Sequence, residues 1–230
     1  MKIEGSVALV TGANRGIGNA IALALLENGA AKVYAGARKP ETITDPRLTP
    51  VKLDVTNPDD IAAVAGLAQD VRIVVNNAGM GGGEAQLLSG PLSVAREVME
   101  TNLFGPWEIA RAFAPMLAGG ALVNVLSVSS WWAMASAPAY SASKAAAWSL
   151  TNALRVGLPE TLVVGVHSGF VDTEFSAWTS APKITAADLA AQTVKALLEN
   201  RIEVLADEFT TETRAALSGD LDALQAVKPY

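Results

Sequence analysis

Short β-branched runs alternate with longer amphipathic stretches along most of the chain, and this alternation restricts the possible folds more than any other feature. The longer stretches are predicted helices, because apolar residues recur in them at helical spacing. Predicted strands cover 7–11, 32–36, 51–53, 72–76, 122–126, 162–167 and 202–205, and predicted helices cover 16–28, 58–68, 93–117 with an interruption near 105–106, 139–158 and 185–199. This order predicts a Rossmann-type, doubly wound α/β fold, with helices on both faces of a mostly parallel sheet.

The chain length favours a single unit. A chain of 230 residues can bury one substantial core and is short for two domains. No internal repeat or linker composition divides it. We therefore expect one cofactor-binding and catalytic domain over 1–230, with a short substrate lid at about 173–185. The tail at 209–230 shows no pattern that assigns it a place.

Composition argues against several classes of function. The net charge is −6 and no run of basic residues occurs, so a nucleic-acid or anionic membrane surface is not expected. The chain has no cysteine and a single histidine, His167, which argues against a metal site. We expect His167 to be a hydrogen-bonded residue at a strand end. No signal peptide or membrane-spanning run is recognised, so a cytoplasmic location is predicted.

The stretch TGANRGIG at 11–18 places three glycines, Gly12, Gly16 and Gly18, between a predicted strand and a predicted helix. Glycines let the backbone turn sharply and approach a ligand closely. The helix N-terminus then presents unpaired N–H groups and a positive dipole end to an anion. The stretch therefore predicts a phosphate-binding loop of a nucleotide site, with an ordinary strand–helix turn as the alternative.

Further motifs follow in a fixed order along the chain. Asp54 follows the third strand, NNAG at 76–79 follows the fourth, and Asn102 lies in the long helical stretch. Ser127 follows the fifth strand and precedes a Tyr140-x-x-x-Lys144 pair by 13 residues. With the spacing of the three glycines, these motifs resemble the short-chain dehydrogenase/reductase family over about 7–202. Ser168 stands where that family has a proline, which leaves this backbone less rigid.

Tyr140 and Lys144 lie four residues apart on a predicted helix and therefore share a face. A cation within hydrogen-bonding range lowers the pKa of a phenol by about 1–3 units, so we expect Lys144 to lower that of Tyr140. The resemblance implies that Tyr140 protonates the substrate oxygen, to which Ser127 donates a hydrogen bond. It also implies that Lys144 holds the nicotinamide ribose and that Asn102 binds a water that relays protons to Lys144.

The expected cofactor is NADP(H). An NAD site usually places a carboxylate about 20 residues past the glycines, on the adenosine ribose. Here Ala37 and Arg38 occupy these positions, and an arginine can bind a 2′-phosphate through two parallel hydrogen bonds in a bidentate contact. The cofactor-binding residues implied by the resemblance and this argument are Gly12, Asn14, Arg15, Gly16, Ile17, Gly18, Arg38, Asp54, Val55, Asn77, Ala78, Gly79, Tyr140, Lys144, Gly169, Val171 and Thr173.

The implied activity is reversible, NADPH-dependent reduction of a small apolar ketone or aldehyde, by a homodimer or homotetramer. Oxidation of a secondary alcohol is the nearest alternative, and a regulator that senses NADP(H) without turnover is a more distant one. Large apolar residues follow Ser127 and Thr173, where the family builds its substrate pocket; packing or a subunit contact would also explain them. The predicted pocket residues are Trp131, Trp132, Met134, Phe175 and Trp178.

Overall fold

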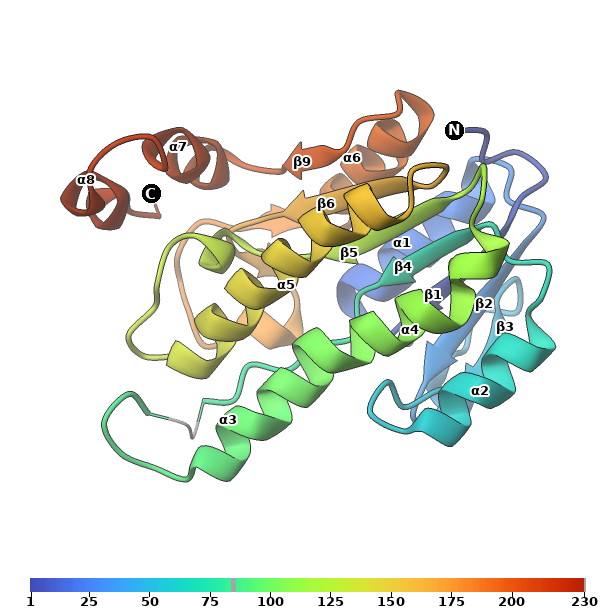
Figure 1. The fold of residues 1–230 in the computed structure, drawn as a ribbon, viewed down its shortest axis with the longest axis horizontal. Coiled ribbons are helices and arrows are strands. Elements are labelled where there is room, and N and C mark those ends of the chain that lie inside the picture. Colours follow the sequence, from blue (N-terminus) through green and yellow to red (C-terminus); the bar gives the residue numbers. More distant parts are fainter. Residues whose placement is uncertain (84–85, 230) are drawn as a thin grey trace.

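The computed structural model describes residues 1–83 and 86–229 and contains a seven-stranded parallel sheet (Figure 1). The strands are β1 (Val7–Thr11), β2 (Lys32–Ala37), β3 (Thr49–Lys52), β4 (Ile73–Asn76), β5 (Ala121–Val125), β6 (Leu162–His167) and β9 (Glu203–Leu205). Their order across the sheet is β3-β2-β1-β4-β5-β6-β9. The predicted Rossmann-type fold is confirmed, and the strand order reverses between β1 and β4, where α/β proteins form ligand crevices.

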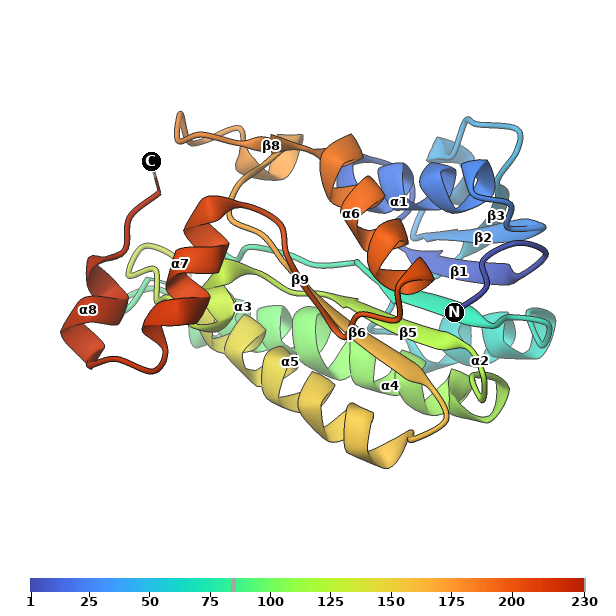
Figure 2. The same cartoon turned by 90° about the horizontal axis from the view of Figure 1, so that it is seen from above.

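Helices cover both faces of the sheet (Figure 2). On one face α1 (Gly16–Glu27) and α6 (Ala186–Leu198) pack against each other. On the other lie α2 (Pro58–Leu67), α4 (Gly105–Phe113) and α5 (Pro138–Gly157). The strands are apolar on both sides because each side meets a helical layer.

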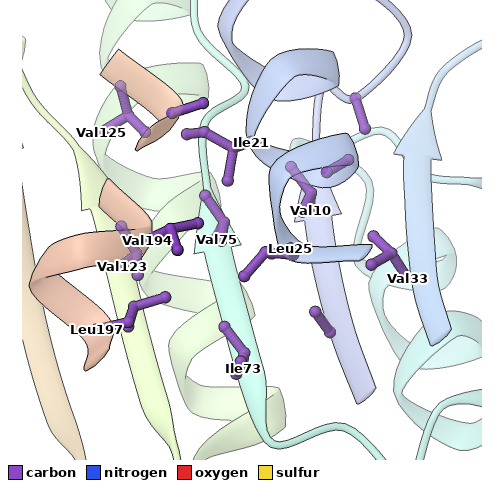
Figure 3. Close-up of a cluster of buried hydrophobic side chains, with 14 of the residues drawn as sticks. Val10, Ile21, Leu25, Val33, Ile73, Val75, Val123, Val125, Val194 and Leu197 are labelled. Carbon is purple, nitrogen blue, oxygen red and sulfur yellow. The ribbon is translucent and has the colours of Figure 1, made fainter. Parts of the chain in front are cut away.

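A core of branched aliphatic side chains fills the space between the sheet and the α1–α6 layer (Figure 3). Its labelled members are Val10, Ile21, Leu25, Val33, Ile73, Val75, Val123, Val125, Val194 and Leu197. A second core lies against the opposite layer, where Ile61 of α2 and Ile109 and Phe113 of α4 pack on the sheet. These two layers hold the carboxyl ends of the strands in fixed positions relative to one another.

The predicted helix over 93–117 has a different internal form. Helix α3 (Leu92–Met99) continues into a π-helical turn (Glu100–Phe104), then α4, and then a 3-10 turn (Ala114–Met116). The irregularity expected near Gly105-Pro106 is therefore present directly before Gly105, while Pro106 itself lies in the first turn of α4, where its missing N–H is not needed. The irregularity is the π-helical turn that precedes it, and this turn contains Asn102.

Some short elements were not predicted. β7 (Val171–Asp172) pairs with β8 (Ile184–Thr185), and a 3-10 turn (Glu174–Ser176) lies between them in the predicted lid. The tail forms α7 (Glu208–Ala216) and α8 (Leu221–Ala226); its last residue, Tyr230, lies outside the described residues. Further 3-10 turns cover Pro40–Thr42 and Val128–Ser130. In the described residues, no helix combines the length and apolar character that crossing a membrane requires.

Two helical glycines give a matched test of this packing. A Cβ on Gly18 in α1 would collide with the carbonyl oxygen of Gly12 and the side-chain nitrogen of Asn77. A Cβ on Gly66 in α2 would meet nothing within 4 Å. We expect Gly18→Ala to lower the free energy of unfolding by about 1–3 kcal/mol through overpacking. Gly66→Ala should raise it by about 0.5–1 kcal/mol, because alanine costs less backbone entropy in a helix.

Urea denaturation of the two purified variants and the wild type measures both changes. A Gly18→Ala protein as stable as the wild type would contradict the close packing of α1 against the end of β1.

Candidate active site

A cavity of about 980 Å³ lies at the carboxyl edge of the sheet. Its lining comes from the segments that follow β1, β2, β3, β4, β5 and β6, together with the first turns of α5 and one residue of α7. Of the predicted site residues it collects Gly12, Asn14, Arg15, Gly16, Ile17, Arg38, Asn77, Ala78, Gly79, Ser127, Trp132, Met134, Tyr140, Lys144, Gly169, Val171, Thr173, Phe175 and Trp178. The reversal of strand order thus brings residues distant in sequence to one site.

The glycine loop forms one wall of this cavity. Gly12 and Gly16 have φ values of +65° and +56°, in the left-handed region that favours glycine. Arg15 is the N-cap of α1, and its side chain makes no hydrogen bond to the first turn of that helix. The N-terminus of α1 therefore presents backbone N–H groups with a positive dipole end, which suits a phosphate.

Asparagines hold the glycine loop against the neighbouring strands. Asn77 Nδ2 donates to the carbonyl oxygens of Thr11 (2.9 Å) and Gly12 (3.1 Å). Thr11 Oγ1 in turn accepts from the backbone N–H of Asn77, at 3.0 Å. Asn76 is a brace between strands, as expected, since its Nδ2 donates to Asn124 Oδ1 on β5 at 2.9 Å. These bonds fix the distance between the phosphate-binding loop and the segment after β4.

Ser127, Tyr140 and Lys144 come together in the wall of the cavity. Ser127 follows β5, whereas Tyr140 and Lys144 lie on one face of the first turns of α5. The Tyr140 hydroxyl is hydrogen-bonded to the Ser127 side chain. Lys144 Nζ donates to the Val125 carbonyl oxygen at 2.8 Å and lies 5.7 Å from the centre of the Tyr140 ring. The hydroxyl pair and the ammonium therefore flank one position within the cavity.

Burial controls the titration of this group. It raises the pKa of Tyr140 above its usual value, and the hydrogen bond from Ser127 only partly opposes this. Burial also lowers the pKa of Lys144 to about 8. The expected lowering of the Tyr140 pKa by Lys144 is therefore wrong for the protein without cofactor, because the ammonium is bonded to a backbone carbonyl and desolvation of the phenol dominates. Near neutral pH the phenol keeps its proton and most of the ammonium remains charged.

The side chain of Asn102 is fully engaged with neighbouring groups. Its Oδ1 accepts from Met80 N at 2.9 Å, and its Nδ2 donates to Met80 O and Ser143 Oγ, each at 2.9 Å. A small cavity of about 10 Å³ is lined by Asn102, Lys144 and Asn76. This space is close to the minimum for one water molecule. Asn102 thus anchors the segment after β4, and the water relay through it stays a prediction.

The two arginines predicted to bind the cofactor differ in their surroundings. Arg15 forms an ion pair with Glu174 of the predicted lid, and both side chains are largely exposed. Arg38 directly follows β2, is exposed and lines the cavity. An exposed ion pair contributes little to stability and leaves a cation able to exchange partners.

Three predicted cofactor residues lie outside the cavity lining. Gly18 packs α1 against the glycine loop. The Asp54 carboxylate accepts from the backbone N–H and the hydroxyl of Thr56, at 3.0 and 2.8 Å. Val55 is buried against Gly105 at the start of α4. Leu53, just before Asp54, lines the cavity in their place.

Trp131 also departs from its predicted place in the substrate pocket. It is buried and is absent from the cavity lining. Its ring stacks on His167 with centres 4.0 Å apart, and it meets Trp148 edge-on at 6.0 Å. His167 Nδ1 is 3.1 Å from the Ser127 carbonyl oxygen, as expected for a hydrogen-bonded histidine at a strand end. Burial lowers the pKa of His167 to about 3, so the ring is neutral.

Several residues of the cavity lining were not predicted, among them Phe170, Ser129 and Phe209. Phe170 lies beside the predicted lid, and Ser129 lies two residues after the predicted Ser127. Phe209 comes from α7, in the tail that the sequence did not place. The sequence around Phe209, DEFTTET at 207–213, is polar and charged, so no local pattern indicated that this ring lines a pocket.

Comparisons with known proteins agree on one family. The sequence profile named "short chain dehydrogenase" matches residues 6–183. An uncharacterized oxidoreductase of Staphylococcus aureus is 32% identical over 216 residues, which cover 84% of this chain and 91% of that protein. A short chain dehydrogenase of Aspergillus terreus is 30% identical over 195 residues, which cover 76% of this chain. The chain spans only 43% of that fungal protein's length.

Solved structures give the same result. A short chain dehydrogenase from Burkholderia cenocepacia, crystallised with NADP, has a TM-score of 0.93 and 41% identity, covering 98% of both chains. A short chain dehydrogenase/reductase from Burkholderia phymatum, crystallised with NAD, has a TM-score of 0.81 and 24% identity, covering 95% of this chain and 96% of that chain. The second likeness concerns the fold alone.

The buried His167 predicts a specific acid sensitivity. The unfolded chain takes up a proton on this ring near pH 6.5, whereas the folded protein does so only near pH 3. The unfolded state thus binds more protons between these values, and stability falls as the pH falls through this window. We expect the unfolding free energy of the wild type to decline by up to about 1.4 kcal/mol per pH unit more than that of His167→Asn.

Urea denaturation at pH 6.5, 5.5 and 4.5 tests this, and asparagine can retain the hydrogen bond to the Ser127 carbonyl. Parallel pH dependence in the two proteins would show that His167 is not held neutral by the fold.

Proposed function

The chain belongs to the short-chain dehydrogenase family and is an oxidoreductase acting on CH–OH or C=O groups, and we propose that it reduces ketones or aldehydes with NADPH. The observation that supports this proposal most strongly is the convergence of Ser127, Tyr140 and Lys144 in one cavity with the glycine loop and Arg38. A phosphate-binding wall and a proton donor then face the same space. The same groups also support the reverse oxidation of an alcohol.

The residues of the loop suit a dinucleotide. Gly12 and Gly16 allow a close approach of the backbone, and the N-terminus of α1 would hold the pyrophosphate. Asn77, Ala78 and Gly79 would lie along the middle of the cofactor, and Gly169, Val171 and Thr173 near its nicotinamide end. When bound, NADPH supplies the hydride that adds to the carbonyl carbon.

The side chains of this protein would supply the proton and hold the oxygen. Burial keeps the Tyr140 phenol protonated, so its proton is available to the carbonyl oxygen. Ser127, which is hydrogen-bonded to Tyr140 in the protein without substrate, would turn its hydroxyl proton to that same oxygen when the substrate binds. Lys144 carries a charge over most of the neutral range and would stabilise the phenolate that forms. Each of these roles depends on the short distances among three side chains at one strand end.

The preference for NADPH over NADH rests on the end of β2. Ala37 is buried there and Arg38 is exposed, and neither supplies a carboxylate to a ribose hydroxyl. Arg38 would bind a 2′-phosphate, with Arg15 as a second cation once it exchanges Glu174 for the phosphate. The Burkholderia cenocepacia relative, which is 41% identical, was crystallised with NADP, and this also supports the assignment.

The proposal extends to assembly and location. On α4, Trp107 stacks on Phe104 at 6.5 Å, and both side chains are 43% exposed. Exposed stacked aromatics of this kind favour a subunit contact, as in a homodimer or homotetramer. The cytoplasm remains the predicted location. A regulator that senses NADP(H) without turnover is less well supported, because it has no need for Tyr140 beside Lys144.

Tyr140→Phe tests the proton donor. We expect kcat for ketone reduction to fall about 10²- to 10⁴-fold, because the phenol supplies the proton. NADPH affinity should stay close to that of the wild type, since the glycine loop provides most of the binding. Tyr34→Phe is the matched control, because Tyr34 is buried in β2 and its hydroxyl bonds to Lys32. A Tyr140→Phe enzyme that kept more than a tenth of the wild-type kcat, with chemistry rate-limiting, would rule Tyr140 out as the acid.

Arg38→Ala tests the choice of cofactor. A charge-assisted hydrogen bond contributes about 1.5–3 kcal/mol, so the variant should lose roughly 10- to 150-fold in NADPH affinity. NADH affinity should barely change. Arg47→Ala serves as the control, since Arg47 is paired with Asp45 and lies outside the cavity. Calorimetric titration of both cofactors measures these constants, and equal losses for NADH and NADPH would refute the assignment.

A further inference from the structure

Large apolar side chains line part of the cavity that also holds Ser127 and Tyr140, and we call this group of side chains the aromatic end. Its members come from three segments: the one after β5, the one after β6, and the start of α7. They are Trp132, Met134, Phe170, Phe175, Trp178 and Phe209. Most of them are rings, and rings present flat surfaces to a bound molecule.

The rings pack in pairs that keep these surfaces in place. Trp132 meets Phe209 edge-on with centres 5.5 Å apart, and Phe170 meets Trp178 edge-on at 5.7 Å. Phe175 lies 5.8 Å from the ring of Tyr140, the proposed proton donor. Aromatic rings prefer edge-to-face and offset-stacked neighbours at such distances. An aryl group attached to the reacting carbonyl would therefore find partners directly beside that carbonyl.

The charged side chains around the cavity are largely committed to other groups. Lys144 Nζ donates to the Val125 carbonyl, and Arg15 and Arg38 are the residues proposed to bind the cofactor phosphate. Asp172 lies 4.0 Å from Lys183. A carboxylate on the substrate would lose hydration at the aromatic end without gaining a dedicated cation. The chemistry of this end therefore favours an uncharged substrate.

Phe209 reaches the cavity because Asp207 holds the start of α7. One Asp207 carboxylate oxygen accepts from Gly169 N at 2.7 Å. The other accepts from the backbone N–H and the hydroxyl of Thr210, at 2.8 and 2.7 Å, and so caps α7. A Cβ on Gly169 would lie 3.1 Å from the Phe209 ring, so the ring packs directly on that glycine. A single carboxylate thus joins the loop after β6, which lacks proline at Ser168, to the helix that carries Phe209.

We propose that the substrates are uncharged aryl ketones or aldehydes, that Phe209 determines this specificity, and that Asp207 is its positioning residue. The proposal rests on the proposed carbonyl reductase activity and names the substrate class of that same site. It also gives a role to the C-terminal tail, since α7 completes the wall formed by the segment after β5.

The first experiment compares kcat/KM for acetophenone and butanone with NADPH. The wild type should favour acetophenone by about tenfold or more, and Phe209→Leu should reduce that ratio about three- to tenfold, in line with the loss of an aromatic pair. Phe113→Leu is the matched control, because Phe113 is buried in α4 away from the cavity. A wild type that prefers butanone, or equal changes in both variants, would overturn the proposal.

The charge requirement has its own comparison. The wild type should use para-acetylbenzoate, which is acetophenone with a ring carboxylate, at least about tenfold less well than acetophenone. Equal or better use of the charged ketone would overturn the choice of an uncharged substrate.

Asp207 is tested by conservative rescue. Asp207→Ala should lower the acetophenone preference, whereas Asp207→Asn should restore part of it, because an amide oxygen can still accept the N–H bonds. Asp220 caps α8 in the same way, accepting from Ala223 N at 2.7 Å, and it does not line the cavity. Asp220→Ala should therefore lose a helix cap and keep the wild-type ratio. An unchanged acetophenone-to-butanone ratio in Asp207→Ala, or an equal shift of that ratio in Asp220→Ala, would show that Asp207 does not position Phe209.

Ligand binding separates this proposal from the reductase proposal. Tryptophan fluorescence titration gives the affinity for acetophenone and butanone without turnover. Reduction of both ketones without preference would refute the aromatic specificity and leave the reductase intact. If no carbonyl compound is reduced, the two affinities decide. Tighter binding of acetophenone than of butanone, weakened in Phe209→Leu, would support the aromatic site alone. Equal affinities for the two ketones would refute the aromatic site. Should Phe209→Leu fail to fold, Trp132→Leu tests the same wall and should shift the preference in the same direction.

Discussion

The arrangement of the site depends on the close packing of α1 against the carboxyl ends of β1 and β4. Gly18 lies against the carbonyl of Gly12, and the Asn77 side chain spans from the loop after β4 to both Thr11 and Gly12. Because Gly18 brings no side chain to this junction, there is room for the Asn77 amide, and the glycine loop lies directly beside the segment after β4. The neighbouring strands then set the position of Ser127, which follows β5. Because Ser127 is hydrogen-bonded to Tyr140, they also set the distance between the proposed nicotinamide position and the proposed proton donor.

Burial then sets the proton affinities of Tyr140 and Lys144. A phenol and an ammonium placed in water would titrate at similar pH, and neither would be poised for reaction near neutrality. The fold withdraws both from water, and the two shifts run in opposite senses: the pKa of Tyr140 rises and that of Lys144 falls to about 8. Near neutral pH the phenol is protonated and the ammonium mostly charged, as in water, but burial makes the phenol hold its proton more tightly and the amine less tightly. The ammonium is held by the Val125 carbonyl, so its place does not depend on the phenol.

The sequence predicted the parts of this structure that repeat a simple rule. Strands buried on both faces read as apolar runs, and the glycines of 11–18 lie where the strand–helix junction needs them. Local patterns did not predict features that depend on contacts between distant segments. The side chain of Asn102 in the π-helical turn bonds to Met80 and Ser143, which are distant in sequence. Trp131 was wrongly predicted to line the substrate pocket, because it stacks on His167, which lies 36 positions away. The place of Phe209 in the cavity wall was not predicted, because it depends on the hydrogen bond between Asp207 and Gly169, which forms only in the folded chain.

The central claim is that the fold, before any cofactor binds, holds Lys144 desolvated beside a protonated Tyr140. Its most direct test is a pH titration of the Lys144 side chain by NMR in the cofactor-free protein, with the signal assigned by its loss in Lys144→Arg. The account predicts that the amine titrates near pH 8, well below its ordinary value of 10.5. A midpoint near 10.5 would show that Lys144 is solvated, and would contradict the account of how this site prepares its proton donor.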